Sequence, residues 1–403
     1  MRMPSSGGPG APSAPCSAPA ALRTFHLPNT SGGDGDELGH AMMMEDMFSI
    51  SDIIEEEGFY TRRRTTTAVA KRPPKGTLSD PMEVPTSVEA RKATEGGLDF
   101  LQRLTSPVFF STREADGQVV TGLSELPETR PVLFVGNHQT YATDLGPLIA
   151  GVLEEKGMLI RGLAHPMAFQ GFRASEDSTD EAEGRSGQAQ QPGQGPGSAG
   201  LLSAYGAVPV SARNMYNLLN NGEAVLLYPG GVREAYKRKG EEYKLIWPDK
   251  PEVIRMAARF GATIVPLSAV GIDDNVDIIA DAEDLLSLPV LGDYIRDRTS
   301  GIPTARNTDA TPEIDETFIA PIPAPQTPGR YYFLFGTPIR TDPSMVKDGE
   351  LAEDLYKKLK SGVEEGIEYL CTKRDEDPYS DFFKRLVYEA SWGGTKQAPT
   401  FKP

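Results

Sequence analysis

A histidine and an aspartate stand six positions apart in the segment GNHQTYATDLG, residues 136–146, directly after the apolar run PVLFV. Histidine, whose ordinary pKa is about 6.5, can remove a proton from an alcohol at neutral pH. A carboxylate on the second ring nitrogen would fix the tautomer and stabilise the imidazolium, and Asp144 is the candidate for that role beside His138. The alternative is structural: His138 is then a hydrogen-bonded core histidine, and Asp144 caps the helix that follows.

A second group of candidates follows the apolar run AVLL, in the segment YPGGVREAYKRKG, residues 228–240. Glycines let a ligand approach the backbone closely, and their N–H groups can face a developing oxyanion. The basic residues are candidates for holding the phosphates of a carrier thioester. A tight turn followed by a solvated helix face remains the alternative, because nearby glutamates offset the basic charge. The candidate donor- and substrate-binding residues are Asn137, Gly230, Gly231, Arg233, Glu234, Lys237 and Arg238.

Composition and missing motifs exclude several classes of protein. The net charge of −16 argues against a general nucleic-acid binder. Two cysteines, Cys16 and Cys371, are too few for a disulfide framework or a cysteine-based zinc site, and the four histidines show no metal-ligand spacing. The absence of a G-x-S-x-G elbow argues against a serine α/β-hydrolase. No apolar run approaches the roughly 20 residues that span a bilayer, so we expect a soluble or peripheral protein.

Hydrophobic periodicity predicts strands that alternate with helices, which indicates an α/β domain with a mostly parallel central sheet flanked by helices. Strands are expected at 130–136, 158–165, 206–210, 223–231, 262–271 and 329–339. Helices are expected at 89–104, 146–157, 212–222, 251–261 and 377–393, and along an apolar stripe that recurs every four residues from Leu351 to Ile367. Residues 272–328 have mixed character and no assigned element.

The N-terminal region and one internal segment are predicted to lie outside the core. Residues 1–33 contain no acidic residue and are rich in Ser, Pro, Gly and Ala, a composition typical of an organelle transit peptide and equally of a generic disordered tail. We therefore predict a disordered region at 1–86 and one folded domain at 87–395. Residues 173–200 are low-complexity and are predicted to form a disordered surface insert in that domain.

Taken together, the order of the segments resembles the acyltransferase domain of the plastid phytyl ester synthases of plants and algae, which are similar to type-2 diacylglycerol acyltransferases. The blocks that carry the resemblance are NHQTYATDLG, RGLAHPMAF, GAVPVSARN, AVLLYPGGVREAYKRKG and PGRYYFLFGTPI. The resemblance covers about residues 98–392, apart from the insert.

The resemblance implies a glycerolipid-acyltransferase-like domain that moves a fatty acyl group from a thioester or lipid donor to an alcohol, such as phytol or diacylglycerol. It maps the catalytic pair onto His138 and Asp144 and the donor block onto Gly230, Gly231, Arg233 and Glu234. It implies acyl-CoA or an acyl-acyl carrier protein as co-substrate, with no further cofactor and no metal. The expected partners are lipids at a membrane or droplet surface and an acyl carrier protein, with no nucleic acid. The expected place is the chloroplast, at a plastoglobule or thylakoid surface.

Two features depart from that pattern. Five residues separate His138 from Asp144, where glycerol-phosphate acyltransferases have four. Plant phytyl ester synthases also carry an α/β-hydrolase-like domain, of which this chain shows no serine elbow. A lipid esterase or thioesterase, in which His138 activates water, and a non-catalytic lipid-surface protein therefore stay open as alternatives. His165, at the end of the run RGLAH, is expected to be structural.

Overall fold

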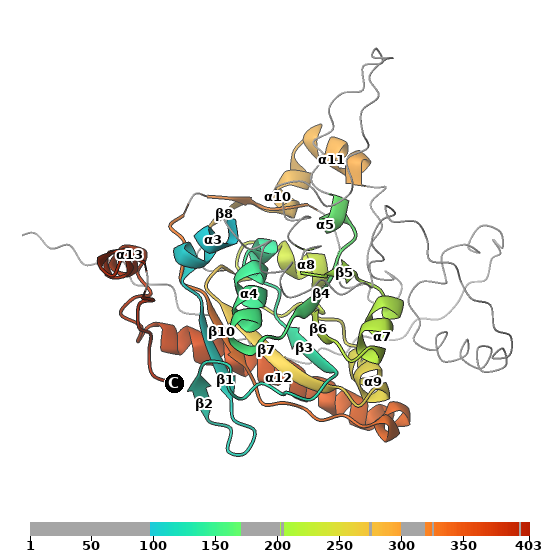
Figure 1. Cartoon of the computed structure of the whole chain (residues 1–403). Coiled ribbons are helices and arrows are strands. Elements are labelled where there is room, and N and C mark those ends of the chain that lie inside the picture. The colour runs from blue at the N-terminus through green and yellow to red at the C-terminus, as the bar shows by residue number, and fades with distance from the viewer. Residues whose placement is uncertain are drawn as a thin grey trace, which may run out of the picture.

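An eight-stranded sheet forms the centre of the protein (Figure 1). The structure is a computed structural model, and it describes residues 97–170, 202, 205–273, 276–299, 319–324, 326–394 and 396–403. The strand order is β2-β1-β10-β7-β3-β6-β4-β5. Within this sheet β3 pairs in parallel with both β6 and β7, whereas β10 runs antiparallel to β7. The predicted α/β class with a mostly parallel sheet is confirmed.

The strands of this sheet are β1 (Val108–Thr112), β2 (Val119–Thr121), β3 (Val132–Gly136), β4 (Ile160–Ala164), β5 (Val208–Pro209), β6 (Ala224–Leu227), β7 (Thr263–Val270) and β10 (Tyr332–Phe335). Two short strands, β8 (Ile278–Ala280) and β9 (Ile322–Pro323), pair separately. The helices are α3 (Gly97–Thr105), α4 (Leu145–Lys156), α5 (Met167–Gln170), α7 (Ala212–Asn220), α8 (Gly231–Ala235), α9 (Glu252–Arg259), α10 (Ala282–Ser287), α11 (Leu291–Thr299), α12 (Gly349–Arg374) and α13 (Phe382–Ser391). Two short 3-10 helices are η2 (Thr140–Ala142) and η5 (Pro343–Lys347).

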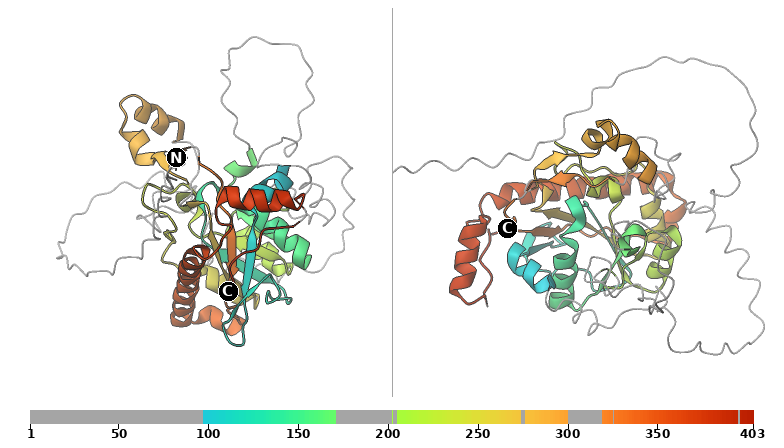
Figure 2. Two further views of the ribbon diagram at one scale, coloured as in Figure 1. Left: turned by 90° about the vertical axis from the view of Figure 1, so that its left-hand side faces the viewer. Right: turned by 90° about the horizontal axis from the view of Figure 1, so that it is seen from above.

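Both faces of the central strands are covered by helices, which explains their continuous apolar runs. Every residue of β3 and of β7 is buried. On one face α7, α9 and α12 contribute to a large core, for example through Leu359 and Val363. On the other face α4 contributes Leu148 and Val152 to a second core. Figures 1 and 2 show α4 and α12 on opposite sides of the sheet.

Helix α12 lies unusually close to β7. The hydroxyl of Ser268 on β7 donates to the carbonyl of Val363 on α12 at 2.9 Å. A methyl group at position 366 would overlap with the Ser268 side chain, so glycine is required there. This contact fixes α12, the longest helix among the described residues, against the strand whose carboxyl end carries part of the site.

The predicted elements map closely onto the structure. The strands expected from buried runs appear as β3, β4, β5, β6, β7 and β10, and the expected helices as α4, α7, α9, α12 and α13. The unassigned region 272–328 contains β8, α10, α11 and β9. The N-terminal region 1–86, the first part of the helix predicted at 89–104 and the insert at 173–200 lie outside the described residues. None of the helices within the described ranges is long and apolar enough to cross a membrane.

Candidate active site

The candidate residues gather at one edge of the sheet. His138 follows the last residue of β3 by two positions, Tyr228 follows β6 directly, and Asp273 follows β7 by three positions. Because β3 is parallel to both β6 and β7, the carboxyl ends of the three strands meet at the same edge. This edge is where open α/β sheets usually bind ligands.

His138 is held by hydrogen bonds on both sides of its backbone. Its N–H donates to Oε1 of Glu234 at 3.0 Å, and its carbonyl accepts from Nζ of Lys237 at 2.5 Å. The ring Nδ1 lies 2.9 Å from the carbonyl oxygen of Gln139. A carbonyl can only accept, so Nδ1 carries the proton of the neutral ring and Nε2 keeps the lone pair.

The protonation state of His138 follows from its surroundings. Burial, helped by the charge of Lys237, lowers the pKa of His138 to about 4, against the opposing effect of the hydrogen bond that the ring donates to the Gln139 carbonyl. The imidazole is therefore neutral at pH 7. A neutral ring with the lone pair on Nε2 is the form that can accept a proton from a hydroxyl group.

Asp144 does not make the hydrogen bond to His138 that the sequence predicts. Its Oδ2 accepts from the side-chain amide of Gln139 at 3.2 Å, and its Oδ1 is buried without a partner. Gln139 thus contacts both residues, His138 through its main-chain carbonyl and Asp144 through its side chain. Burial raises the pKa of Asp144 to about 6. An orienting role for Asp144 remains a prediction, and its route is through Gln139.

The structural alternative for Asp144 also fails in its simple form. Asp144 precedes α4, but its side chain makes no capping hydrogen bond. Asp144 is 1 % exposed, and its carboxylate accepts from Gln139 instead of capping the helix. A buried carboxylate with one unpaired oxygen is costly unless a ligand or water completes it.

Asn137 differs from its expected role in substrate binding. Its side-chain amide donates to the carbonyl of Ala269 at 2.9 Å, and its side-chain oxygen accepts from the Ala269 N–H at 2.8 Å. The nitrogen and the oxygen of the Asn137 side chain are therefore both bonded within the protein. The Asn137 side chain therefore ties the end of β3 to β7, and this contact fixes the position of the next residue, His138.

Gly230 is needed because the side chain of Glu234 lies against it. A methyl group at position 230 would overlap with the carboxylate and Cβ of Glu234. Gly231 has φ +54°, a left-handed conformation that favours glycine, and its N–H donates to the carbonyl of Tyr228 at 3.1 Å. The N–H of Gly231 is thus engaged in the turn, and of the two glycines Gly230 is the remaining candidate for an oxyanion donor.

Three buried oxygen atoms near His138 lack a hydrogen-bond partner within the described residues: Oδ1 of Asp144, Oε2 of Glu234 and the hydroxyl of Tyr228. The Tyr228 ring lies 4.6 Å from the His138 ring, centroid to centroid. Burial raises the pKa of Tyr228, and the carboxylates of Asp144 and Glu234 raise it further, so the phenol stays protonated. Burial also raises the pKa of Glu234 to about 7. Unpaired buried oxygens beside a proton acceptor are suited to a substrate hydroxyl group.

A buried ion pair between Lys237 and Asp273 stabilises this edge of the sheet. Lys237 Nζ lies 3.1 Å from Oδ2 of Asp273, and both side chains are almost fully buried. Asp273 also accepts from the N–H and hydroxyl of Thr140, at 2.8 and 2.9 Å, and from the N–H of Tyr243 at 3.0 Å. Sequence reasoning missed Asp273. An acidic residue directly beyond a fully buried strand is the signal that would have identified it.

The basic residues differ from the expectation that they hold donor phosphates. Arg233 makes a bidentate pair with Glu241, at 2.6 and 2.8 Å. Lys237 is buried in its pair with Asp273. Arg238 pairs with Glu283 at 2.5 Å on α10. Each cation already faces a carboxylate, which for Arg233 lies eight residues on and for Lys237 and Arg238 lies more than 30 residues away.

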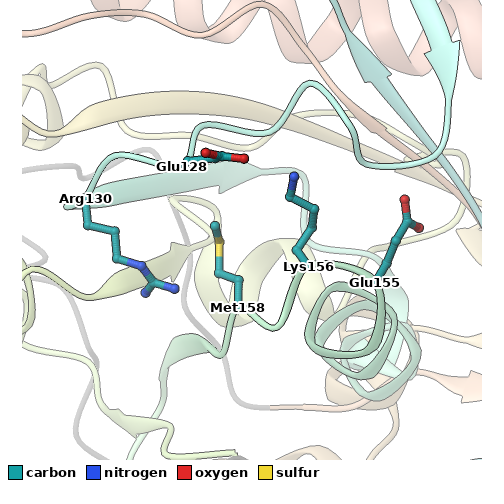
Figure 3. Close-up of a pocket in the computed structure, with 5 residues that line it drawn as sticks. All are labelled: Glu128, Arg130, Glu155, Lys156 and Met158. Atoms are coloured by element: carbon teal, nitrogen blue, oxygen red, sulfur yellow. The ribbon is translucent and has the colours of Figure 1, made fainter.

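A charged depression lies at the opposite edge of the sheet (Figure 3). It encloses about 270 Å³ and is lined by Glu128, Arg130, Glu155, Lys156 and Met158. Arg130 and Met158 precede β3 and β4, so this depression is at the amino ends of the strands, away from His138. His165 is half-buried, just beyond the end of β4. No group of three His, Cys, Asp or Glu residues in the described ranges is arranged to hold a metal ion.

The fold and site define an α/β protein with a neutral histidine at the carboxyl edge of its sheet. Phytyl ester synthase 1, chloroplastic, from Arabidopsis thaliana is 37 % identical over 369 residues, which cover 91 % of this chain and 48 % of that protein. Phytyl ester synthase 2, chloroplastic, of the same plant is also 37 % identical, over 368 residues. The resemblance expected from the sequence blocks is confirmed. The chain spans about half the length of these curated relatives.

Two more distant similarities were found. A Bos taurus protein named DGAT1/2-independent enzyme synthesizing storage lipids is 23 % identical over 151 residues, 38 % of each chain. The crystal structure of the 1-acyl-sn-glycerophosphate acyltransferase PlsC from Thermotoga maritima superimposes with a TM-score of 0.35 and 15 % identity, covering 70 % of this chain and 79 % of that one. No protein-family model matches the sequence.

Proposed function

We propose that the chain is an O-acyltransferase that moves a fatty acyl group from a thioester or lipid donor to an alcohol such as phytol or diacylglycerol. The observation that carries the proposal is the neutral ring of His138, with its proton on Nδ1 and its lone pair on Nε2, at an edge of the sheet where three buried oxygens lack a hydrogen-bond partner. The 37 % identity to two phytyl ester synthases supports the same chemistry.

With a thioester donor the reaction proceeds in two steps that need no covalent enzyme intermediate. Nε2 of His138 takes the proton of the acceptor hydroxyl while its oxygen attacks the thioester carbonyl. The tetrahedral intermediate then collapses, the C–S bond breaks, and the imidazolium returns the proton to the leaving thiolate. The products are an ester and a free thiol, so atoms and charge balance.

The surrounding residues act on position and charge. Glu234 and Lys237 hold the His138 backbone, and the Gln139 carbonyl fixes its tautomer. We assign Asp144 a positioning role through Gln139. The N–H of Gly230 is the proposed donor to the developing oxyanion. The proposed co-substrate is acyl-CoA or an acyl-acyl carrier protein. Its phosphates are not assigned to Arg233, Lys237 or Arg238, because each of these already pairs with a carboxylate.

Product analysis tests this function and separates it from its alternatives. Purified protein is incubated with labelled acyl-CoA, or with acyl-acyl carrier protein, in the presence and absence of phytol and of diacylglycerol. A labelled ester that appears only with added alcohol supports acyl transfer. Free acid alone identifies an esterase or thioesterase, in which His138 activates water. Absence of turnover with every combination, together with tight lipid binding, identifies a non-catalytic lipid-surface protein.

We also propose a chloroplast location, at a plastoglobule or thylakoid surface. Both Arabidopsis relatives are named chloroplastic, and residues 1–33 carry no acidic residue. A fluorescent fusion of residues 1–80 is expected to enter plastids. Fluorescence of that fusion in the cytosol or endoplasmic reticulum would count against the proposal.

A further inference from the structure

One small unit exposes most of the large apolar side chains at the protein surface. We call β8, α10, α11 and β9, residues 278–299 and 322–323, the flap. The described residues expose eleven large hydrophobic side chains, and six of these lie on the flap: Ile279, Leu288, Val290, Leu291, Tyr294 and Ile322. Figure 2 shows α10 and α11 standing out from the layered body. Such a concentration of apolar surface marks a docking site.

The turn between α10 and α11 is the most exposed part of the flap. Four consecutive apolar residues, Leu288-Pro289-Val290-Leu291, are all exposed there, and Val290 is 81 % exposed. Val290 also has φ +69°, a left-handed conformation that is a genuine outlier for a β-branched residue. Neither solubility nor local geometry favours valine at this position. A strained, exposed, apolar turn therefore indicates a function in contact with something apolar.

The flap is attached to both segments that build the site. The Tyr141 hydroxyl, three residues after His138, donates to the carbonyl of Pro321, the residue directly before β9, at 2.6 Å. Arg238 and Lys239, which follow the buried Lys237, pair with Glu283 and Asp284 at the start of α10. The flap consequently lies at the same edge of the sheet as His138 (Figure 1).

The charge of the flap indicates what kind of apolar surface it meets. The residues of the flap carry five acidic and two basic side chains. An anionic lipid surface would repel this segment, because anionic lipids attract basic side chains. A lipid surface without net headgroup charge accepts the apolar turn and leaves the acidic residues in water.

We propose that the α10–α11 turn inserts into a lipid surface of zero net headgroup charge and so places the His138 edge next to lipid-borne substrates. This proposal deepens the proposed acyltransferase function and rests on it for its biological purpose. The other exposed apolar stripe, Phe383, Leu386 and Val387 on α13, makes none of the contacts described above with the segments that build the site. It therefore provides a matched control.

Vesicle co-sedimentation of the whole protein tests the proposal. The variant Leu288→Asn with Val290→Asn removes two exposed apolar side chains, and asparagine tolerates the left-handed position better than valine. The control, Leu386→Asn with Val387→Asn, makes the same chemical change at side chains that are 50 % and 71 % exposed. We expect wild-type protein and the control to bind phosphatidylcholine vesicles, and the flap variant to bind at least about tenfold more weakly.

Turnover measurements distinguish failure of this inference from failure of the proposed function. The flap variant should keep wild-type turnover with short-chain, water-soluble donor and alcohol, and lose turnover only with substrates carried in vesicles. Vesicle binding is measured independently of turnover, so it tests the inference even if the protein proves inactive. The inference is overturned if wild-type protein ignores phosphatidylcholine and binds only vesicles with anionic phosphatidylglycerol. It is equally overturned if the α13 variant loses binding instead, or if the flap variant turns a dimer into a monomer, since a second copy then covers the turn.

Discussion

The carboxyl group of Glu234 fills the space that any side chain at position 230 would need. The same carboxyl accepts the backbone N–H of His138 at 3.0 Å. Gly230 is therefore tied to the position of the histidine through volume, although it does not touch the imidazole in any contact described above.

Gly230→Ala should displace Glu234 and loosen His138. We expect a loss of about 1–3 kcal/mol in the free energy of unfolding from overpacking, together with a large loss of acyl transfer. Thermal unfolding and turnover measure the two effects. Gly162→Ala is the matched control, since its nearest neighbour would be the Ala207 methyl at 3.9 Å, and it should change stability little. Wild-type turnover in Gly230→Ala would contradict the link between Glu234 and His138.

His138→Ala should lower acyl transfer by roughly 10²–10⁴-fold while the protein stays folded. His138→Gln keeps hydrogen-bonding bulk and should be as inactive, because an amide cannot act as the base. His165→Ala is the internal comparison. We expect it to lower the thermal midpoint clearly and to leave turnover close to that of the wild type. The reverse pattern would move the acid–base role to His165.

Asp144→Asn tests the relay through Gln139. Asparagine keeps an oxygen that can accept the Gln139 amide, but it removes a carboxylate whose pKa is raised to about 6. Ionisation of Asp144 costs folding free energy as the pH rises through that value, so Asp144→Asn should be at least as stable as wild type at pH 8. Turnover should fall less than in His138→Ala. A loss as large as that of His138→Ala would indicate direct participation of Asp144 in catalysis.

Glu234→Gln should change how stability depends on pH. Burial raises the pKa of Glu234 from 4.5 to about 7. A carboxyl with a raised folded-state pKa contributes stability that is complete below the unfolded pKa and is lost as pH rises through the folded value. Glutamine stays neutral, so the drop in thermal midpoint between pH 5 and pH 8 should be smaller in the variant. Glu242→Gln, an exposed change of the same kind, should keep the wild-type dependence.

Lys237→Met should strongly destabilise the protein. It leaves the carboxylate of Asp273 buried without its cation, and breaking one side of a buried pair costs about 3–5 kcal/mol. Lys239→Met removes an exposed cation paired with Asp284 and should cost at most about 1 kcal/mol. Chemical denaturation of both variants, with Asp273→Asn and the Lys237→Met/Asp273→Asn double variant, measures the coupling. Additive losses would show that the pair contributes no mutual stabilisation.

The fold could be predicted from the sequence because buried strands and helices produce apolar runs and periodic apolar positions. The run VLFVG predicts β3, and Gly157, in the left-handed conformation, ends α4 where the sequence places it. Region 272–328 left no such trace. The turn between α10 and α11 exposes Leu288, and the start of α11 exposes Leu291, so the apolar residues there do not mark an inner face.

The site was accessible only in part. Motif order identified His138, but the partner of its Nδ1 is a main-chain carbonyl, which every residue carries. Asp273 and Lys237 meet through tertiary folding across 36 residues of sequence, and no local spacing rule connects them. The sequence made Arg233 a candidate phosphate ligand, but in the structure its guanidinium donates both hydrogen bonds to Glu241.

The sequence separations around His138 have a consequence for how the site forms. Its N–H is held by a residue 96 positions away, its carbonyl by one 99 positions away, and the neighbouring Thr140 by one 133 positions away. The base therefore acquires its orientation only after β6 and β7 have both docked on β3, and contacts of such separation form slowly. During synthesis, a nascent chain that ends before Asp273 lacks the residue that holds Thr140 and the cation of Lys237. Onset of the proposed acyl transfer would thus report that β6 and β7 have docked on β3, and a refolding assay that follows this activity should lag behind one that follows helix content.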